Sequence, residues 1–205
     1  MSIKVIVFDL GKVLFDYDLN LISNAFIPYA QKKEDLKDIN KFMMSNDEFF
    51  SKYEKGKISS EDFYNELSEI AGLNVDYEKF CNLWNNIFTP IQNMLNFIPK
   101  LNKKYRLAIL SNTNELHYEF LETLYPDLFK NFNDFFLSYR MTLRKPEKEI
   151  YKQVIDYYEL KAKELFFTDD LDINVIAAKK AGINAFVFKN LEKLKKDLSM
   201  HGVKV

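Results

Sequence analysis

Cysteine is nearly absent from this chain of 205 residues, which contains only Cys81. A single cysteine cannot form a disulfide within the chain, so the disulfide-rich secreted class is excluded. The two histidines, His117 and His201, lie too far apart in the sequence to suggest a zinc motif. Five glycines and five prolines leave few sites for flexible linkers, so we expect most residues to lie in helices and strands. This composition predicts a cytoplasmic protein.

Charge of one sign is lacking as well, because 29 basic and 30 acidic residues leave a formal net charge of −1. No global field would therefore draw the chain to nucleic acid or to an anionic membrane. The apolar start at residues 3–8 is too short for a signal peptide, and no segment approaches the about 18 apolar residues that a membrane span needs. We expect a monomer or weak dimer without nucleic-acid or membrane partners.

Five short apolar runs have the length and the β-branched or aromatic content of buried parallel strands. They lie near residues 3–8, 106–110, 134–138, 165–168 and 184–188. Helical patterns alternate with the last four runs, with apolar positions at three- and four-residue spacing over 90–104, 115–124, 147–158 and 173–181. This βαβ rhythm predicts the α/β fold class with a doubly wound parallel sheet.

The segment from about residue 18 to 88 has a helical pattern and no strand candidate. Within it, Ser59 or Ser60 precedes acidic residues and an apolar face, which predicts a helix start, and Gly72 is the predicted end of that helix. The segment is therefore predicted to be an all-helical insertion with its own apolar core. We accordingly divide the chain into an α/β core, residues 1–16 and 89–205, and a helical cap, residues 17–88.

Polar side chains follow the predicted strands, and open α/β sheets bind ligands beyond the carboxyl ends of their strands. Taken singly, each of these residues has an ordinary explanation, such as a loop aspartate, a helix cap or a solvated lysine. Together they predict that carboxylates, a hydroxyl and an ammonium converge at one edge of the sheet. The residues are Asp9, Gly11, Lys12, Ser111, Asn112, Lys145, Asp169, Asp170 and Asn174.

The predicted carboxylate cluster requires a cation. Two like charges 4 Å apart repel by about 4 kcal/mol at an effective dielectric of 20, so Asp9, Asp169 and Asp170 would destabilise one another. Hard oxygen ligands with no histidine or thiol beside them favour Mg²⁺, which usually takes one or two carboxylates, waters and phosphate oxygens. The sequence therefore predicts a magnesium site.

Four segments resemble the motifs of the haloacid dehalogenase-like superfamily. In order, they are VIVFDLGKVLFD, LAILSNT, RKPEKEIY and FFTDDLDINVIAAKKAGI, over residues 1–16 and about 90–190. The resemblance implies a Rossmann-like core, and the helical insertion resembles the C1-type cap of that superfamily. The segment YEKGKISSEDFYNEL together with DLG is most similar to the branch containing α-D-glucose 1-phosphate phosphatases. The implied function is Mg²⁺-dependent hydrolysis of a small phosphorylated metabolite, such as a sugar phosphate.

The resemblance also implies catalytic roles. Asp9 is the nucleophile that accepts the phosphoryl group as an aspartyl-phosphate. Ser111 and Asn112 hold phosphoryl oxygens, and Lys145 neutralises charge on the nucleophile and on the phosphate.

The implied metal ligands are Asp170, a carboxylate oxygen of Asp9 and the carbonyl oxygen of Gly11. Asp169 and Asn174 are implied to be secondary metal ligands or supporting groups that hold Asp170 and its waters.

Gly11 departs from the superfamily, because most of its phosphatases have an aspartate there as general acid and base. Such catalysis is typically worth about 10² to 10⁴-fold, so another group substitutes or the leaving group needs little help. Asp16, Asp169 and a metal-bound water are candidates, and the choice among them is open. An anomeric oxygen departs readily as an anion, which fits a sugar 1-phosphate.

Lys12 stands where the superfamily usually has a small residue. Two interpretations are open: its side chain contacts the phosphate or the cap, or it is solvated.

Two other functions compete with a phosphatase. A haloacid dehalogenase shares Asp9, Ser111 and Lys145 but needs no metal, which would leave Asp169 and Asp170 without a purpose. A module that binds a phosphorylated ligand without turnover is compatible with the loss of the acid at Gly11.

Overall fold

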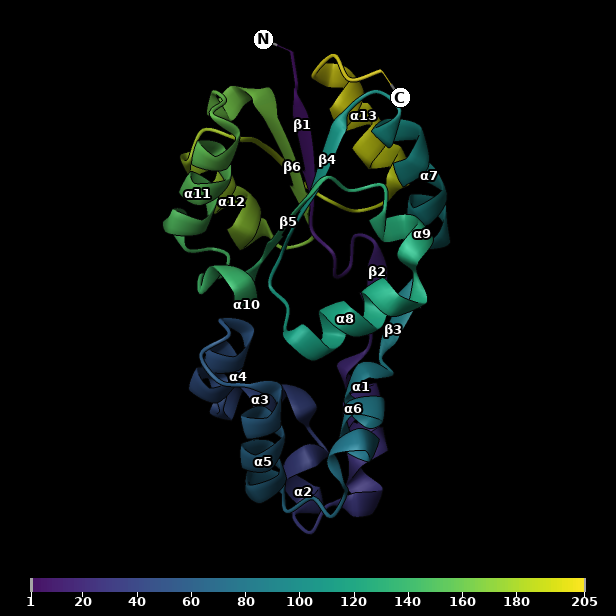
Figure 1. Ribbon diagram of the computed structural model, residues 1–205, viewed down its shortest axis with the longest axis vertical. Helices are drawn as coiled ribbons and strands as arrows, with labels where there is room; N and C mark the ends of the chain where they lie inside the picture. The colour runs from purple at the N-terminus through teal and green to yellow at the C-terminus, as the bar shows by residue number, and fades with distance from the viewer. Residues whose placement is uncertain (1, 205) are drawn as a thin grey trace.

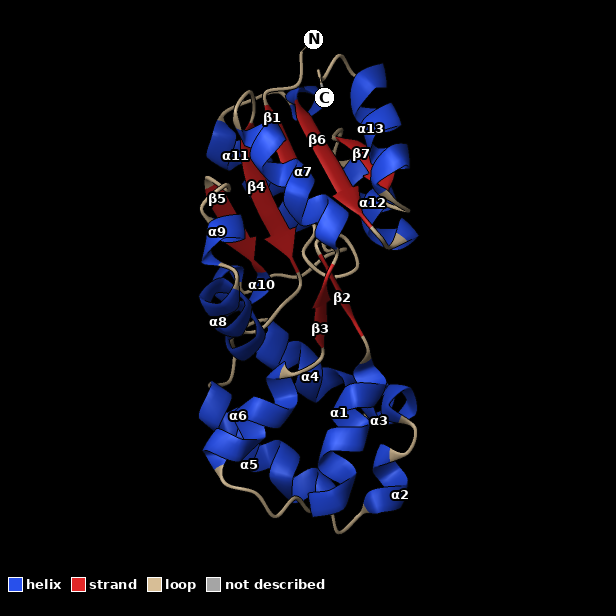
Figure 2. Ribbon diagram, turned by 90° about the vertical axis from the view of Figure 1, so that its right-hand side faces the viewer, coloured by secondary structure: helices blue, strands red, loops and turns tan. Residues whose placement is uncertain are grey.

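A five-stranded parallel sheet forms one end of the computed structural model, which describes residues 2–204 (Figures 1 and 2). The strand order is β5-β4-β1-β6-β7, so β1 lies between the two halves of the sheet. The five predicted runs all form strands, and the predicted α/β fold class is confirmed. The strands are β1 (Val5–Phe8), β4 (Arg106–Ser111), β5 (Asp134–Leu137), β6 (Leu165–Asp169) and β7 (Asn184–Val187).

Helices cover both faces of this sheet because alternate strand residues are apolar on both sides. Ile6 and Phe8 pack in one core with the helices α7, α8, α9 and α13. Val5 and Val7 point to the opposite face and pack with α11 and α12. The bounds are α7 (Gln92–Asn102), α8 (Glu115–Leu124), α9 (Pro126–Phe129), α10 (Ser138–Met141), α11 (Lys148–Tyr158), η2 (Ala162–Glu164), α12 (Asp172–Lys180) and α13 (Leu191–Met200).

Residues 19–85 form a separate group of helices at the other end of the molecule (Figure 1). Its centre is aromatic: Phe63 is fully buried, and its ring stacks on Tyr53 at a centroid distance of 3.9 Å. The Phe63 ring also meets the edge of Trp84 at 4.9 Å. The helices are α1 (Leu19–Phe26), η1 (Ile27–Tyr29), α2 (Lys33–Leu36), α3 (Ile39–Ser45), α4 (Asp47–Glu54), α5 (Ser60–Ala71) and α6 (Tyr77–Asn85).

Helix α5 begins and ends as its sequence predicts. The Ser59 side chain accepts a hydrogen bond from the Asp62 N–H at 3.0 Å, which satisfies a free donor of the first turn. Gly72 ends the helix with a φ of 63°, a left-handed conformation that glycine adopts without strain.

Two short strands join the helical group to the sheet. Strand β2 (Phe15–Tyr17) pairs antiparallel with β3 (Phe88–Pro90), and Figure 2 shows this ribbon between the two ends of the molecule. The sequence prediction missed both strands, and the helix predicted from Pro90 begins instead at Gln92. Each strand has three residues, so its formation depends on a partner more than 70 positions away in the chain. Within residues 2–204, no helix is both long enough and apolar enough to span a membrane.

Candidate active site

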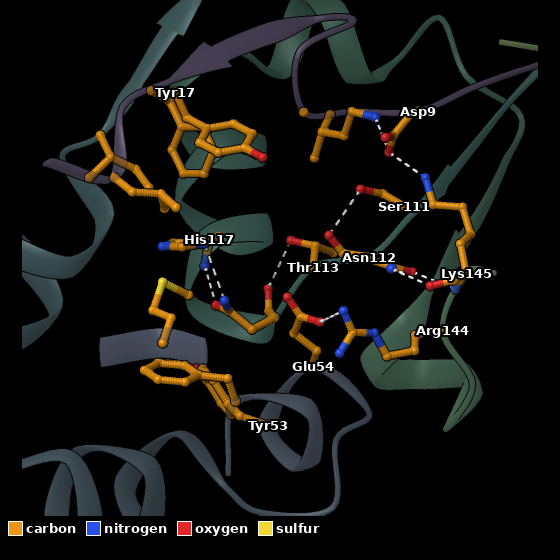
Figure 3. Close-up of a pocket in the computed structure, with 18 of the residues that line it drawn as sticks. Asp9, Tyr17, Tyr53, Glu54, Ser111, Asn112, Thr113, His117, Arg144 and Lys145 are labelled. Atoms are coloured by element: carbon orange, nitrogen blue, oxygen red, sulfur yellow. Dashed lines mark hydrogen bonds and ion pairs between the residues drawn. The ribbon is translucent and has the colours of Figure 1, made fainter. Parts of the chain in front are cut away.

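The carboxyl ends of three neighbouring strands open onto one cavity, between the sheet and the helical group. Asp9 follows β1, Ser111 ends β4 and Asp170 follows β6, and Lys145 reaches the same cavity from the loop before α11. The space measures about 250 Å³. Because parallel strands β4, β1 and β6 are adjacent, their ends meet at one edge of the sheet. The residues predicted from the sequence to converge there line this cavity, except Lys12 and Asp169, and Asp169 contacts Lys145. Figure 3 shows Asp9, Ser111, Asn112 and Lys145.

Lys145 is the buried cation at the centre of the site. Its Nζ lies 2.8 Å from Asp9 Oδ1 and 2.6 Å from Asp169 Oδ2, and the side chain is only 1% exposed. Although burial alone would lower the pKa of Lys145, the two carboxylates raise it, so the ammonium keeps its charge. A lysine this deeply buried is held by its partners, because an unpaired ammonium would lose several kcal/mol of hydration.

Asp169 is fixed by groups that face it from α12 and from Lys145. Its Oδ1 accepts hydrogen bonds from the Leu171 N–H and from Asn174 Nδ2, both at 2.9 Å. Its Oδ2 accepts from Lys145 at 2.6 Å and from Asn174 at 3.1 Å. Both oxygens are thus engaged inside the protein, and Asp169 is fully buried. This arrangement suits a support for Lys145 better than a group that exchanges protons with substrate.

Asn112 holds the backbone of Lys145. Its Nδ2 donates to the Lys145 carbonyl at 2.8 Å, and its Oδ1 accepts from the Lys145 N–H at 2.7 Å. The amide side chain is therefore occupied by Lys145. The neighbouring Ser111 hydroxyl makes only a long contact of 3.4 Å with the Asn112 carbonyl, which leaves it available to a ligand in the cavity.

Two carboxylates of the site have raised pKa values. Burial raises the pKa of Asp9 to about 7, with Lys145 lowering it and Asp169 raising it further. Burial, together with the charge of Asp169, also raises the pKa of Asp170. Three carboxylates and one ammonium leave two negative charges uncompensated in the cluster. Burial is thus the main cause of the raised pKa values, and the neighbouring carboxylate charge adds to it.

The same cluster fits a divalent metal ion. One oxygen from each of Asp9, Asp169 and Asp170 lies within 4.8 Å of the other two, so a single ion can reach them. The donors are hard oxygens, which Mg²⁺ prefers, and its two positive charges match the excess of the cluster. Gly11, whose carbonyl was predicted as a further ligand, also lines the cavity.

Lys12 and Asp16 lie outside the cavity. The Lys12 ammonium pairs with Asp16 and donates to the Tyr17 carbonyl at 2.6 Å, and both residues line a different hollow near Asn190. Lys12 has a φ of 56°, which turns the chain after Gly11. The structure therefore directs these two candidates toward Tyr17, and neither of them into the cavity with Asp9.

Two charged residues of the cavity were missed by the sequence analysis. Glu54 at the end of α4 pairs with Arg144, with Oε2 and Nη2 3.2 Å apart, so the helical group and the sheet meet across the cavity (Figure 3). Burial raises the pKa of Glu54 although Arg144 opposes it. Arg144 could have been found beside Lys145 in its motif, but nothing near Glu54 in the sequence signals a site.

His117 links α8 to the helical group. Asn114 Nδ2 lies 3.1 Å from His117 Nδ1, and His117 Nε2 lies 3.2 Å from the Trp84 carbonyl oxygen. Since a carbonyl only accepts, Nε2 carries the proton and Nδ1 accepts from the amide. Burial lowers the pKa of His117 to about 4, so the ring is neutral at pH 7. The sequence placed His117 in a helix, which is α8, but gave it no contact with the cavity.

Comparisons with known proteins relate the chain to hydrolases. Residues 6–188 match the model of a family described as haloacid dehalogenase-like hydrolase. A D-ribitol-5-phosphate phosphatase from Bacteroides thetaiotaomicron is 29% identical over 194 residues, covering 92% of this chain and 93% of that protein. A sesquiterpene phosphatase from Aspergillus oryzae is 28% identical over 193 residues, covering 89% and 88%. The matched range includes every cavity residue named above.

A solved structure is similar along almost its whole length. It is an HAD family enzyme from Bacteroides thetaiotaomicron, crystallised in complex with magnesium and inorganic phosphate. It is 30% identical with a TM-score of 0.81, and the alignment covers 94% of this chain and 99% of that one.

Proposed function

Because the chain belongs to the haloacid dehalogenase-like hydrolases, we propose that it is a magnesium-dependent phosphomonoester hydrolase in which Asp9 is the nucleophile. The observation that carries the proposal is the buried contact of Lys145 with both Asp9 and Asp169, beside a third carboxylate and a cavity that Ser111 also lines. The similarity to phosphatases and to a magnesium and phosphate complex supports it.

In the first step, an Asp9 carboxylate oxygen attacks phosphorus and the bond from phosphorus to the leaving oxygen breaks, with its electron pair staying on that oxygen. Lys145 holds Asp9 in position and neutralises charge on the transferring group. The Ser111 hydroxyl donates to a phosphoryl oxygen. In the second step, water attacks the aspartyl-phosphate, which releases phosphate and restores the carboxylate.

Asp9, Asp170 and the Gly11 carbonyl would hold Mg²⁺, which supplies further neutralisation of phosphate charge when bound. Asp169 and Asn174 support the site by fixing Lys145, through the hydrogen bonds described above. The Asn112 side chain supports Lys145 in the same way, from the backbone side.

We also propose that residues 17–88 are a cap on a core of residues 1–16 and 89–205. Contacts across the cavity, such as Glu54 with Arg144, support a cap that closes over bound substrate. Closure would exclude water from the first transfer. A cap held shut by a cross-link yet turning over substrate at the normal rate would contradict this role.

A small polyhydroxylated phosphate, such as a sugar phosphate, is the proposed substrate class. Glu54 and Arg144 offer an acceptor and donors to hydroxyl groups, and the cavity is small. Apolar side chains of the helical group favour a second class, a phosphate on an apolar chain, as in the sesquiterpene phosphatase. These side chains are Ile22, Met43, Phe50 and Trp84.

A substrate screen distinguishes the two classes. Phosphate release would be measured with Mg²⁺ on sugar 1-phosphates, their 6-phosphate isomers, a pentitol phosphate and a prenyl monophosphate. We expect turnover of the hydroxylated substrates. A clear preference for the 6-phosphate over the 1-phosphate would contradict the resemblance to glucose 1-phosphate phosphatases, and a preference for the prenyl phosphate would support the apolar class.

The hydrolase assignment itself is tested with p-nitrophenyl phosphate. We expect turnover that requires Mg²⁺, stops with EDTA and falls by at least about 10³-fold in Asp9→Asn, because the amide cannot attack phosphorus. The exposed residue Asp172 provides the matched control, and Asp172→Asn should retain activity. Metal-independent release of halide from a haloacid would favour a dehalogenase. Phosphate binding without any turnover would favour a binding module.

A further inference from the structure

Tyr17 projects into the cavity from strand β2, on the side opposite Lys145 (Figure 3). Among residues 2–204, no group hydrogen-bonds its hydroxyl, and that oxygen is not sealed from the cavity. The hydroxyl of Tyr53 and the ring nitrogens of His117, which also line the cavity, already have partners. The Tyr53 hydroxyl contacts Ser60 at 3.0 Å. Tyr17 is therefore the aromatic side chain with a hydroxyl free for a ligand.

The Tyr17 ring occupies the space beside Gly11. A Cβ atom at position 11 would lie 2.9 Å from Tyr17 Cε1 and 3.5 Å from Cδ1. The φ of Gly11 is outside the left-handed range, so glycine is needed here for space. A side chain at position 11 and the ring of Tyr17 thus compete for the same part of the cavity, next to Asp9.

Lys12 and Asp16 hold Tyr17 in this position. The Lys12 ammonium lies 4.7 Å from the centre of the Tyr17 ring and donates to the Tyr17 carbonyl at 2.6 Å. Asp16 Oδ1 accepts from the Tyr17 N–H at 2.8 Å. Strand pairing with Phe88 fixes the backbone from the other side. The two residues that the sequence singled out near the first motif are contacts of Tyr17.

The electrostatic surroundings keep the Tyr17 hydroxyl protonated. Burial, followed by the charges of Asp170 and Asp9, raises the pKa of Tyr17 to about 12. A group with this pKa is a hydrogen-bond donor at neutral pH. The Tyr17 ring packs beside Gly11 and lines the same cavity as Asp9 and Asp170, so the hydroxyl shares the space in which the phosphoryl group would bind.

We propose that the Tyr17 hydroxyl donates a hydrogen bond to the leaving oxygen of the phosphate ester, in the space that a side chain at position 11 would otherwise fill. This inference rests on the proposed phosphatase function. In an in-line attack by Asp9, the leaving oxygen stands on the side of phosphorus opposite to Asp9. That side faces the interior of the cavity. The leaving oxygen keeps the electron pair of the broken bond, the hydrogen bond stabilises its growing charge, and its proton comes from water.

Tyr17→Phe tests this role with two substrates of similar shape. The leaving group of benzyl phosphate is a basic alkoxide, whereas that of p-nitrophenyl phosphate is a stable anion. Removing one donor to a developing oxyanion costs about 10² to 10³-fold. We therefore expect kcat/KM for benzyl phosphate to fall about 10²-fold, and at least about tenfold further than for p-nitrophenyl phosphate.

Tyr29→Phe is the matched control, because this half-exposed tyrosine of η1 does not line the cavity. It should leave both rates unchanged. Equal losses on both substrates in Tyr17→Phe would indicate a structural role and overturn the inference, as would no loss on either. If the unmodified protein hydrolysed neither substrate with Mg²⁺, the hydrolase assignment would fail and this inference with it.

A side-chain exchange tests the shared space. Tyr17→Ala removes the ring, and adding Gly11→Asp to it supplies a carboxyl group in its stead. We expect the double variant to recover benzyl phosphate turnover at least about tenfold relative to Tyr17→Ala, while p-nitrophenyl phosphate changes less. Equal recovery on both substrates, or none, would overturn the claim that position 11 and Tyr17 serve the same oxygen.

Discussion

Lys145 joins two carboxylates that would otherwise repel each other inside the protein. Its ammonium lies within 2.8 Å of Asp9 and 2.6 Å of Asp169, in a region closed to solvent. Two unit charges 4 Å apart interact by about 4 kcal/mol at an effective dielectric of 20, so this cation decides whether the cluster can stay ionised. A buried pair that is broken on one side commonly costs about 3 to 5 kcal/mol. The same residue therefore serves folding and chemistry.

His117 makes the stability of the protein depend on pH. Its pKa is about 4 in the folded protein and about 6.5 in an unfolded chain. Between these values the unfolded chain binds the proton and the folded protein does not, so the free energy of unfolding falls as pH drops from about 6.5 to 4. The full pKa shift would lower the free energy of unfolding by about 3 kcal/mol. Because His117 is partly exposed, we expect a decrease of about 2 kcal/mol.

His117→Gln should therefore lose about 2 kcal/mol of the decrease that the unmodified protein shows between pH 6.5 and 4. Urea unfolding at several pH values measures it. His201→Gln is the matched control, and it should keep the full decrease. Parallel pH curves for His117→Gln and the unmodified protein would contradict the assignment of a neutral, buried ring to His117.

The short elements β2 and β3 decide how the helical group meets the sheet. Tyr17 lies on β2 and Phe88 on β3, and both line the cavity. The two strands thus connect the helical group to the sheet and also supply side chains to the cavity. A three-residue strand has little stability alone, so its geometry depends on pairing and on the packing at both ends.

The start of α5 is stabilised by a single side chain, which permits a clean test. Ser59→Ala removes the acceptor of the Asp62 N–H and should lower the free energy of unfolding by about 1 kcal/mol. Chemical denaturation measures this loss, and turnover should stay normal because Ser59 is outside the cavity. Ser199→Ala, on the exposed end of α13, should change stability by less than about 0.5 kcal/mol. Equal losses in the two variants would contradict the capping role.

At the scale of the whole molecule, contacts between residues that do not line the cavity also join the helical group to the rest of the chain. Lys55 and Glu147 form an ion pair of 2.7 Å, and Ser60 Oγ donates to Glu115 Oε2 at 2.5 Å. Gly56 lies so close to the Tyr139 carbonyl that a Cβ atom would come within 2.1 Å. Surface ion pairs are typically worth less than about 1 kcal/mol, so such contacts hold the two parts together without locking them.

Metal binding should stabilise the fold, because the ligands follow β1 and β6, which are far apart in the sequence and are paired only in the folded protein. At a concentration of 100 times its Kd, Mg²⁺ would raise the free energy of unfolding by about 2.7 kcal/mol. Thermal unfolding with Mg²⁺ or EDTA measures the effect. Asp170→Asn should lose most of it, whereas Asp172→Asn, two residues further along, should retain it. Equal stabilisation of both variants by Mg²⁺ would contradict a metal site at Asp170.

The sequence by itself determined the sheet, most of its helices and the chemical types at the strand ends. Apolar runs such as Val5–Phe8 and the capping pattern at Ser59 depend on a few neighbouring residues, so they can be recognised from the sequence alone. The βαβ rhythm also implies parallel strands, whose carboxyl ends place Asp9, Ser111 and Asp170 at one edge of the sheet. The order β4-β1-β6, which makes them neighbours, comes from the structure.

Only the tertiary structure decided which side chains share the cavity. Lys12 and Asp16 stand near the first motif in sequence, yet they turn toward Tyr17 because the chain reverses after Gly11. Glu54 meets Arg144 although 90 positions separate them, since this contact depends on how the helical group packs against the sheet. Local sequence patterns record which face of an element is apolar. They do not record the distances between elements, and those distances determine which groups can react together.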